Sequence, residues 1–462
     1  MGKRCATLML FLVCCCPAPM WAQSPVASDS SGSQAAPPDS SGLKQGQAVS
    51  EETQPSRYPD PNLVPYRTRK SVLVHFLSLP AKVWRLIWSP LGAAMIWEEQ
   101  HHIHQRLINF FLNDDRTGGF FPIISIGGNT GAAGGLTIFH NNLFNKRKRI
   151  RLTVLFNTED NNSVRLMYSD STLFGTPLFL DFGGEFLNDS DENFFIRPDV
   201  TQQELDDSSI RANESTENDE TSYAVERGGF NVALGYALHR RTSIALTSRF
   251  QRSDIRRGED EEAERFPITV PGFSTTSLFS VGAVVTVDFR NGWPRTLSGS
   301  LLRFAYQYNR EVNGGRFEYN RFTIEAQQFI PVPFLALNRR LAVRGRFEKL
   351  DRLNGRQIPF YELSLLGDAW TLRGFEQNRF RGRGSLLFNV EYRYPVWDTW
   401  DAVIFIDEGQ VFDDLNEIDF ERFHFAIGTG FRFMSRRGFL FRVEVGFSRE
   451  TIRGLFQITP NF

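Results

Sequence analysis

The feature that most constrains the fold of this chain is a two-residue alternation of apolar and polar side chains, which recurs from about residue 120 to the end. In the stretch GFLFRVEVGFSRE at 438–450, phenylalanines and valines fall on one face, whereas Arg442 and Glu444 fall on the other. The stretch RFHFAIGTGFRF at 422–433 repeats this pattern. Because successive side chains of a β-strand point to opposite faces, these stretches predict strands with one apolar face and one polar face.

Sixteen such stretches predict sixteen strands. The predicted ranges are 121–128, 131–141, 148–158, 163–171, 177–187, 227–239, 241–252, 274–289, 296–309, 315–331, 338–349, 385–395, 402–412, 422–434, 438–449 and 454–462. The connections alternate between short turns and long polar loops, the longest being 188–226, 254–273 and 350–384. We therefore predict an all-β, sixteen-stranded antiparallel transmembrane β-barrel, with both barrel termini in the periplasm.

A soluble β-sandwich or propeller is the competing interpretation, because its core could also bury the apolar face. A propeller requires a repeat of about 40–50 residues, and the sequence has none. The 43 phenylalanines of the chain favour a surface that faces lipid. A charged residue on the lipid face of a barrel costs about 2–4 kcal/mol at mid-depth, which accounts for the regular alternation.

The N-terminus has the pattern of an export signal. Lys3 and Arg4 precede an apolar run, and PMWAQ offers a cleavage site after Ala22, which predicts a signal peptide at 1–22. All four cysteines lie within the first sixteen residues, so the predicted mature chain contains none. Acylation of Cys15 or Cys16, as in a lipoprotein, is the alternative.

Two further segments precede the predicted barrel at 119–462. Residues 23–56 are rich in Ser, Gln, Pro and Gly, which predicts a disordered leader. Residues 57–118 carry apolar residues at three- and four-residue intervals and predict an amphipathic helical segment. No stretch after the signal has eighteen consecutive uncharged apolar residues, so we predict no transmembrane helix.

Several other functions find little support in the sequence. The net charge of −1 offers no basic surplus for binding nucleic acid. His101, His102 and His104 are close in sequence, but only two of them share a helical face, so we predict no metal site and no cofactor. No hydrolase or nucleotide-binding motif is present, and we expect no enzymatic activity.

One long loop carries an unusual apolar motif, LRGF, formed by Leu372, Arg373, Gly374 and Phe375. It is followed by GSLLFNVEYRYPV at 384–396 and FIDEG at 405–409. With the barrel pattern around them, these motifs resemble the BamA/TamA-like bacterial surface antigen superfamily of outer-membrane assembly and transport barrels.

The resemblance implies that the loop folds into the lumen and that Arg373 meets acidic residues of the inner wall. Strand alternation indicates the same partners, because it turns Glu391 inward on one strand, and Asp407 and Gly409 inward on the next. We expect Glu391 and Asp407 to lie roughly opposite each other, with the planar guanidinium of Arg373 between them. The alternative is that Arg373 is a solvated loop residue and that both acids are ordinary lumen charges.

The resemblance also implies partners. They are outer-membrane lipids and lipopolysaccharide, the barrel-assembly machinery, which would recognise the terminal aromatic Phe462, and nascent outer-membrane proteins or periplasmic factors. Members with assembly roles carry periplasmic POTRA modules, whereas the segment before the first strand here predicts only helices. We therefore expect a short branch without POTRA domains, which inserts or translocates protein or lipid. A passive, porin-like transport channel is the alternative.

The seam between the first and last strands is expected to be weak. Pro460 in the last strand has no N–H to donate, and the first strand contains Pro122, Gly127 and Gly128. We predict that this pairing is short and, as the resemblance implies, able to open sideways. The alternative is that Pro460 only ends the pairing below the membrane.

Overall fold

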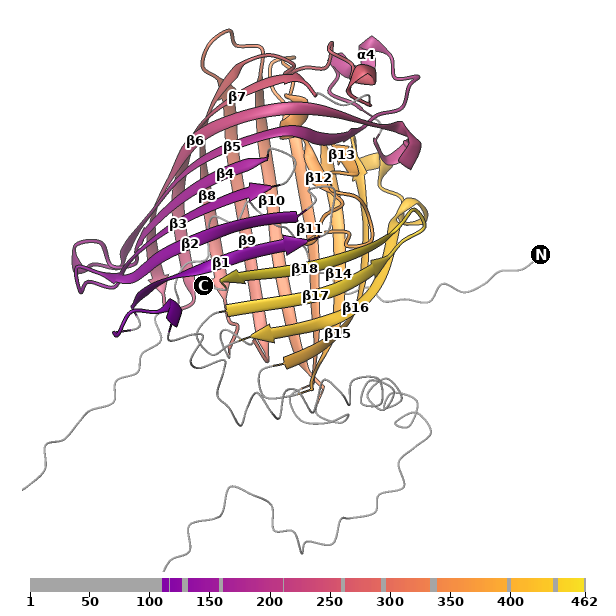
Figure 1. Ribbon diagram of the computed structural model, residues 1–462. Coiled ribbons are helices and arrows are strands. Elements are labelled where there is room, and N and C mark those ends of the chain that lie inside the picture. The colour runs from indigo at the N-terminus through magenta and orange to yellow at the C-terminus, as the bar shows by residue number, and fades with distance from the viewer. Residues whose placement is uncertain are drawn as a thin grey trace, which may run out of the picture. The chain divides into compact units, whose positions relative to one another are not determined.

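The structure is a computed structural model, shown in Figure 1. It describes residues 110–115, 117–126, 132–157, 161–210, 212–258, 262–291, 296–332, 339–396, 400–434 and 439–460. The predicted signal peptide, the leader, most of the helical segment, the three clustered histidines and Phe462 lie outside the described residues. Those predictions therefore remain untested.

The described strands form a closed antiparallel barrel of sixteen strands, which confirms the predicted fold class. Its first eight strands are β1 (Gly118–Ile126), β2 (Ala132–Leu143), β3 (Lys148–Asn157), β4 (Asn162–Asp170), β5 (Leu178–Phe195), β6 (Glu220–His239), β7 (Thr242–Arg257) and β8 (Thr276–Asp288). The other eight are β9 (Gly299–Glu311), β10 (Glu318–Pro331), β11 (Arg340–Arg352), β14 (Gly384–Pro395), β15 (Trp400–Phe412), β16 (His424–Met434), β17 (Phe439–Phe447) and β18 (Ile452–Pro460).

Each barrel strand pairs with the barrel strands before and after it in the chain, and β1 closes the ring by pairing with β18. The first strand begins at Gly118, earlier than predicted, because its first residues pair with the end of β2. Gly127 and Gly128 lie outside the described residues. No helix among the described residues is long and apolar enough to cross a membrane.

The alternation along the strands separates the two surfaces of the barrel. On β5, Phe182 and Phe186 are exposed on the outer face. Glu185, between them in sequence, points the other way and pairs with Arg165 of β4 at 3.0 Å. The polar face of the sheet therefore lines the lumen, as a barrel with lipid around it requires.

The long loops follow β5, β7 and β11, all at one end of the barrel. They contain the minor elements η2 (Ala212–Glu214), η3 (Glu217–Asp219), α4 (Gln202–Asp206), η4 (Glu262–Arg265), η5 (Phe360–Glu362), β12 (Ser364–Leu366) and β13 (Phe380–Gly382). Elsewhere lie η1 (Leu173–Gly175), η6 (Leu415–Glu417) and η7 (Phe420–Arg422).

A hydrophobic core joins these long loops to one another. Phe194 at the end of β5 packs against Phe266 of the loop after β7, with ring centroids 5.0 Å apart. Phe360 of the loop after β11 lies 5.3 Å from Phe194 and 5.5 Å from Phe266. All three rings are buried, so the loops form a packed cap at this end of the barrel.

Candidate functional site

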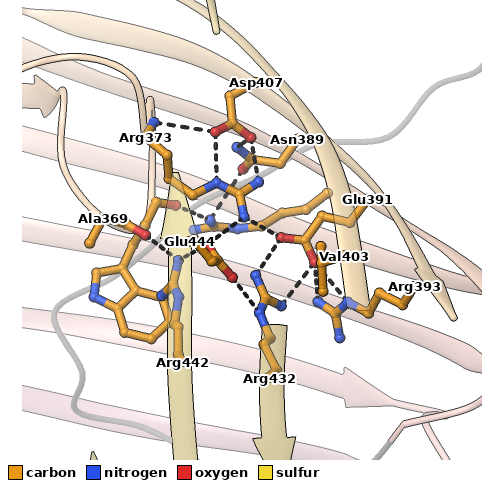
Figure 2. Close-up of polar contacts among 12 residues, drawn as sticks. Ala369, Arg373, Asn389, Glu391, Arg393, Val403, Asp407, Arg432, Arg442 and Glu444 are labelled. Carbon is orange, nitrogen blue, oxygen red and sulfur yellow. Dashed lines mark hydrogen bonds and ion pairs between the residues drawn. The ribbon is translucent and has the colours of Figure 1, made fainter. Parts of the chain in front are cut away.

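The loop between β11 and β14, residues 353–383, is the candidate functional site. It contains the LRGF motif and a small two-stranded sheet in which β12 pairs with β13. Figure 2 shows Arg373 of this loop among charged side chains of the barrel wall. Most of the loop is buried against the inner wall, which explains the apolar residues of its motif.

Asp407 of β15 is the main partner of Arg373. The guanidinium donates from Nε to Asp407 Oδ2 at 2.7 Å and from Nη2 to Oδ1 at 2.6 Å, which is a bidentate pair. The backbone N–H of Arg373 also donates to Asp407 Oδ2 at 3.2 Å. Asp407 therefore holds both the side chain and the backbone of the loop at this residue.

Two glutamates complete the acidic environment of Arg373. Its Nη1 donates to Glu391 Oε1 of β14 at 2.5 Å and to Glu444 Oε2 of β17 at 3.3 Å. The guanidinium carbon lies 3.5 Å from the centroid of the Phe405 ring, which is a cation–π distance. Arg373 is 8% exposed. One side chain of the loop thus contacts three strands of the barrel.

Further arginines neutralise the two glutamates. Arg432 of β16 lies between them, with Nε 2.6 Å from Glu444 Oε1 and Nη2 2.8 Å from Glu391 Oε1. Arg393 pairs with Glu391 at 2.5 Å, and Arg442 pairs with Glu444 at 2.8 Å. Burial of an unpaired charge costs several kcal/mol, so this network is stable only with its charges of both signs in place.

The register of β14 and β15 differs from the predicted one. Asn389, not Glu391, is the partner of Asp407 across the strands, and Glu391 faces Phe405. Glu391 and Asp407 are diagonal neighbours on the inward face. They are therefore close to each other, as predicted, but they are not directly opposite partners. Asn389 donates from Nδ2 to Asp407 Oδ1 at 2.7 Å and to the Thr371 carbonyl at 2.9 Å.

Gly374 allows the loop to approach the wall. A Cβ at Gly374 would lie 2.9 Å from the carbonyl carbon of Phe447 and 3.0 Å from the Cβ of Ala426. The wall also has a glycine at this contact. A Cβ at Gly446 of β17 would lie 2.5 Å from the Arg373 carbonyl oxygen. Both positions require glycine because backbone meets backbone there.

The two apolar residues of the motif fill a second hydrophobic cluster between loop and wall. Leu372 and Phe375 are buried together with Phe380 of β13 and residues of β14, β15 and β16. The rings of Phe375 and Phe380 are 5.1 Å apart, and the ring of Phe380 stacks on His424 at 3.8 Å. The motif therefore combines one ionic anchor with two apolar ones.

Gly409 lies two residues beyond Asp407 on the same face of β15. A Cβ at Gly409 would lie 3.0 Å from the carbonyl oxygen of Leu386 and 3.1 Å from Leu366 Cδ1 of the loop. This tight fit against β12 accounts for the small residue in FIDEG. The structure thus brings all the predicted loop and wall residues together, whereas Phe462 lies outside the described residues.

A second charged residue of the loop, Glu362, was not predicted. Its Oε1 accepts from Arg249 Nη2 at 2.7 Å and from Gln251 Nε2 at 3.0 Å, both on β7. Its Oε2 accepts from Tyr319 at 3.1 Å and from Arg321 at 3.1 Å, both on β10. The buried Glu362 is therefore a second ionic contact between the loop and the wall.

The charge environment of Glu362 keeps it ionised. Burial alone disfavours the carboxylate, but the guanidiniums of Arg249, Arg321 and Arg227 outweigh it and hold the pKa of Glu362 at about 2. The sequence signal for this site is the alternation that turns Arg249 and Arg321 into the lumen, where each requires a counter-charge. The same signal applies to Glu444, whose pairing with Arg373 sequence reasoning also missed.

The comparisons with known proteins agree with this architecture. In sequence, residues 142–452 match the family model described as the Omp85 superfamily domain. BamA from Haemophilus ducreyi, in a crystal structure lacking POTRA domains 1–3, is 16% identical with a TM-score of 0.54, over 74% of this chain and 70% of that chain.

Two further solved structures show weaker similarity. CdiB from Acinetobacter baumannii is 14% identical over 75% of this chain and 60% of that chain, with a TM-score of 0.49. CdiB from Escherichia coli is 12% identical over 73% of this chain and 62% of that chain, with a TM-score of 0.46. No curated protein sequence matches the chain. The family match covers most of the barrel and confirms the resemblance inferred from LRGF and FIDEG: the chain belongs to the Omp85 superfamily of outer-membrane β-barrels.

Proposed function

We propose that this barrel inserts or translocates protein or lipid at the outer membrane, and that it does so by opening the seam between β1 and β18. The observation that carries the proposal is that the pairing of that seam ends at Ile124 and Ile458, although β1 begins at Gly118 and β18 runs on to Pro460. Among the described residues, β1 and β18 share three pairs, from Ile124 with Ile458 to Ile126 with Phe456. By contrast, β1 shares nine pairs with β2, and β18 shares nine with β17.

The prolines of the two strands support this proposal. Continuing the register by two residues past Ile124 and Ile458 would bring Pro122 opposite Pro460. Neither proline has an N–H, so neither can donate a ladder hydrogen bond at that position. β18 nevertheless continues to Pro460 along β17, where Phe439 is the partner of Pro460. At this end, therefore, the pairing of β18 stops at Ile458 on the side of β1 but continues to Pro460 on the side of β17.

The loop fixed inside the barrel favours this function over a passive channel. Arg373 and Glu362 fix the loop to the wall at separate places. The long loops after β5, β7 and β11 pack together at the same end of the barrel. A loop held in this way leaves less of the lumen open to solutes. We therefore propose the seam, and not an open lumen, as the route by which substrate reaches the membrane.

Depletion of the protein in its native host tests this proposal. We expect misassembled outer-membrane proteins to accumulate, or the lipid asymmetry of the outer membrane to be lost, before the uptake of small solutes changes. Planar-bilayer recordings of the purified protein supply the second measurement, and we expect small, flickering currents. Large, steady currents together with unchanged envelope composition would instead support the passive channel.

A further inference from the structure

Two short turns carry exposed aromatic side chains on a strained backbone. Phe144, between β2 and β3, is 76% exposed and has a φ of 58°. Phe174, between β4 and β5, is 90% exposed and has a φ of 55°. A bulky residue other than glycine rarely adopts positive φ, and in a tight turn such a position normally holds Gly, Asn or Asp.

Basic residues accompany these apolar tips. Lys146 and Arg147 are exposed in the same turn as Phe144. In the turn between β6 and β7, Arg240 and Arg241 follow Leu238, which is 62% exposed. The segments 142–148, 171–177 and 236–241 contain no aspartate or glutamate. The three turns together therefore present apolar tips with positive charge.

The three turns are neighbours at one end of the barrel. β3 pairs with β4, β4 with β5 and β5 with β6, so their turns follow one another along the rim. Figure 1 shows these strands running side by side to the same edge, opposite the end capped by the long loops. Turns in such an arrangement can contact one flat surface together.

The outer face of the strands indicates the depth of these turns in a membrane. Ile150 of β3 faces Tyr168 of β4 on this side of the sheet, where the outward side chains are apolar. The next outward positions hold an ion pair, Lys148 with Asp170, at 2.8 Å. A charged pair is tolerated at the edge of the hydrocarbon but is costly within it. The turn with Phe144 follows directly and thus lies at the depth of the lipid headgroups.

We propose that the surface formed by residues 144–147, 173–175 and 238–241 binds anionic phospholipid headgroups. The phenylalanines insert between the headgroups, and Lys146, Arg147 and the arginines of the third turn bind the phosphates. Positive charge beside exposed aromatic side chains is the combination that an anionic membrane surface attracts. This inference concerns how the barrel is held in the bilayer, and it holds whichever substrate the seam admits.

The test is lipid binding by the purified full-length protein, measured by native mass spectrometry during titration with phosphatidylglycerol or phosphatidylethanolamine. We expect Lys146→Gln/Arg147→Gln to weaken phosphatidylglycerol binding by about tenfold or more, since each basic residue near an anionic surface contributes about a factor of five. Binding of phosphatidylethanolamine should not change. The matched control is Arg256→Gln/Arg257→Gln, which removes two exposed charges at the far end of β7. This variant should bind phosphatidylglycerol as tightly as the wild type.

A second measurement tests the aromatic side chains separately. A fluorescent label on Asn145→Cys, in vesicles containing phosphatidylglycerol, should be quenched by lipids that carry a quencher near the headgroup. Adding Phe144→Ser and Phe174→Ser should reduce that quenching. If phosphatidylglycerol binding is the same in the wild type and in Lys146→Gln/Arg147→Gln, the surface serves a protein partner or another part of this chain, and the proposal is wrong.

Discussion

Glu362 and Arg373 lie in the same loop with opposite charges, and they pair with different arcs of the barrel wall. Glu362 accepts hydrogen bonds from β7 and β10, whereas Arg373 donates to β14, β15 and β17. Between the two residues runs β12, which pairs with β13. These two residues therefore hold the loop at separate places on the wall, and Glu376 adds a third contact through Arg453 of β18 at 2.7 Å. Movement of the whole loop requires these ion pairs to break.

Removal of the Arg373 anchor should destabilise the protein strongly. Arg373→Ala leaves Asp407, Glu391 and Glu444 with one guanidinium fewer in a buried network, and we expect a loss of about 3–5 kcal/mol in the free energy of unfolding. Arg373→Lys should restore only part of this, because an ammonium cannot form the bidentate pair with Asp407. Urea unfolding in detergent, monitored by the heat-dependent gel shift of the folded barrel, gives the free energy of unfolding of both variants.

The matched control for Arg373 is Arg352→Ala. Arg352 donates to Asp207 at 2.6 Å in a partly exposed pair, and exposed pairs contribute about 0–1 kcal/mol. We expect the free energy of unfolding of this variant to be close to that of the wild type. Wild-type stability and protease resistance in Arg373→Ala would contradict the assignment of Arg373 as an anchor.

Acid should release the Glu362 contact only at very low pH. Folding lowers the pKa of this carboxyl from 4.5 to about 2, so the stability it contributes is complete above 4.5 and is lost as the pH falls through about 2. Pepsin should therefore leave residues 353–366 intact at pH 4 and cut them near pH 2. Glu362→Gln should be cut at both.

Glu226→Gln removes an exposed partner of Arg256 and serves as the control for the pepsin experiment. It should show the wild-type pH dependence. Equal resistance of Glu362→Gln and the wild type at pH 4 would mean that Glu362 does not hold the loop.

Gly446 should tolerate no side chain, because the loop backbone lies directly against it. Gly446→Ala places a Cβ 2.5 Å from the Arg373 carbonyl oxygen, so the loop or β17 must shift. We expect a loss of about 1–3 kcal/mol, as for overpacked sites generally, and faster protease cleavage of the loop. Gly454→Ala on β18 meets no atom within 4 Å and should leave both properties unchanged.

Loss of the Arg373 and Glu362 contacts together should loosen the loop and widen the lumen. The double variant Arg373→Ala/Glu362→Gln removes the charges that fix the loop to the two arcs of the wall, and we expect larger and longer-lived currents in planar bilayers than for the wild type. Each single variant should show intermediate currents. Unchanged currents in the double variant would contradict the assignment of Arg373 and Glu362 as the residues that keep the lumen closed.

The barrel and its inward faces could be predicted because lipid imposes a strict pattern on each strand. Arg442 and Glu444 alternate with apolar residues, and a charge facing lipid would be costly, so the lumen side of β17 follows from the sequence. Asp407 and Glu391 were accessible to prediction because one short turn joins their strands. The exact register across that turn was not, because the type and length of a turn set the register and alternation alone does not.

Contacts that depend on the path of the loop could not be predicted. Glu362 meets Arg249 and Arg321, whose strands are far from it in sequence, and only the course of the loop across the lumen brings them together. Glu444 reaches Arg373 because the barrel curves, so that β17 lies beside the loop. Alternation determines which face a side chain occupies, but it does not determine which residue on the far wall it meets.

The most direct test of the proposed function is a disulfide across the seam. Ser125→Cys/Gln457→Cys joins register partners of β1 and β18, and Ser163→Cys/Leu187→Cys joins register partners of β4 and β5 as the matched control. In cells depleted of the wild-type copy, we expect the oxidised seam variant to fail to restore envelope assembly and a reductant to rescue it. The oxidised control pair should function throughout. Full function with the seam disulfide completely formed would contradict opening between β1 and β18.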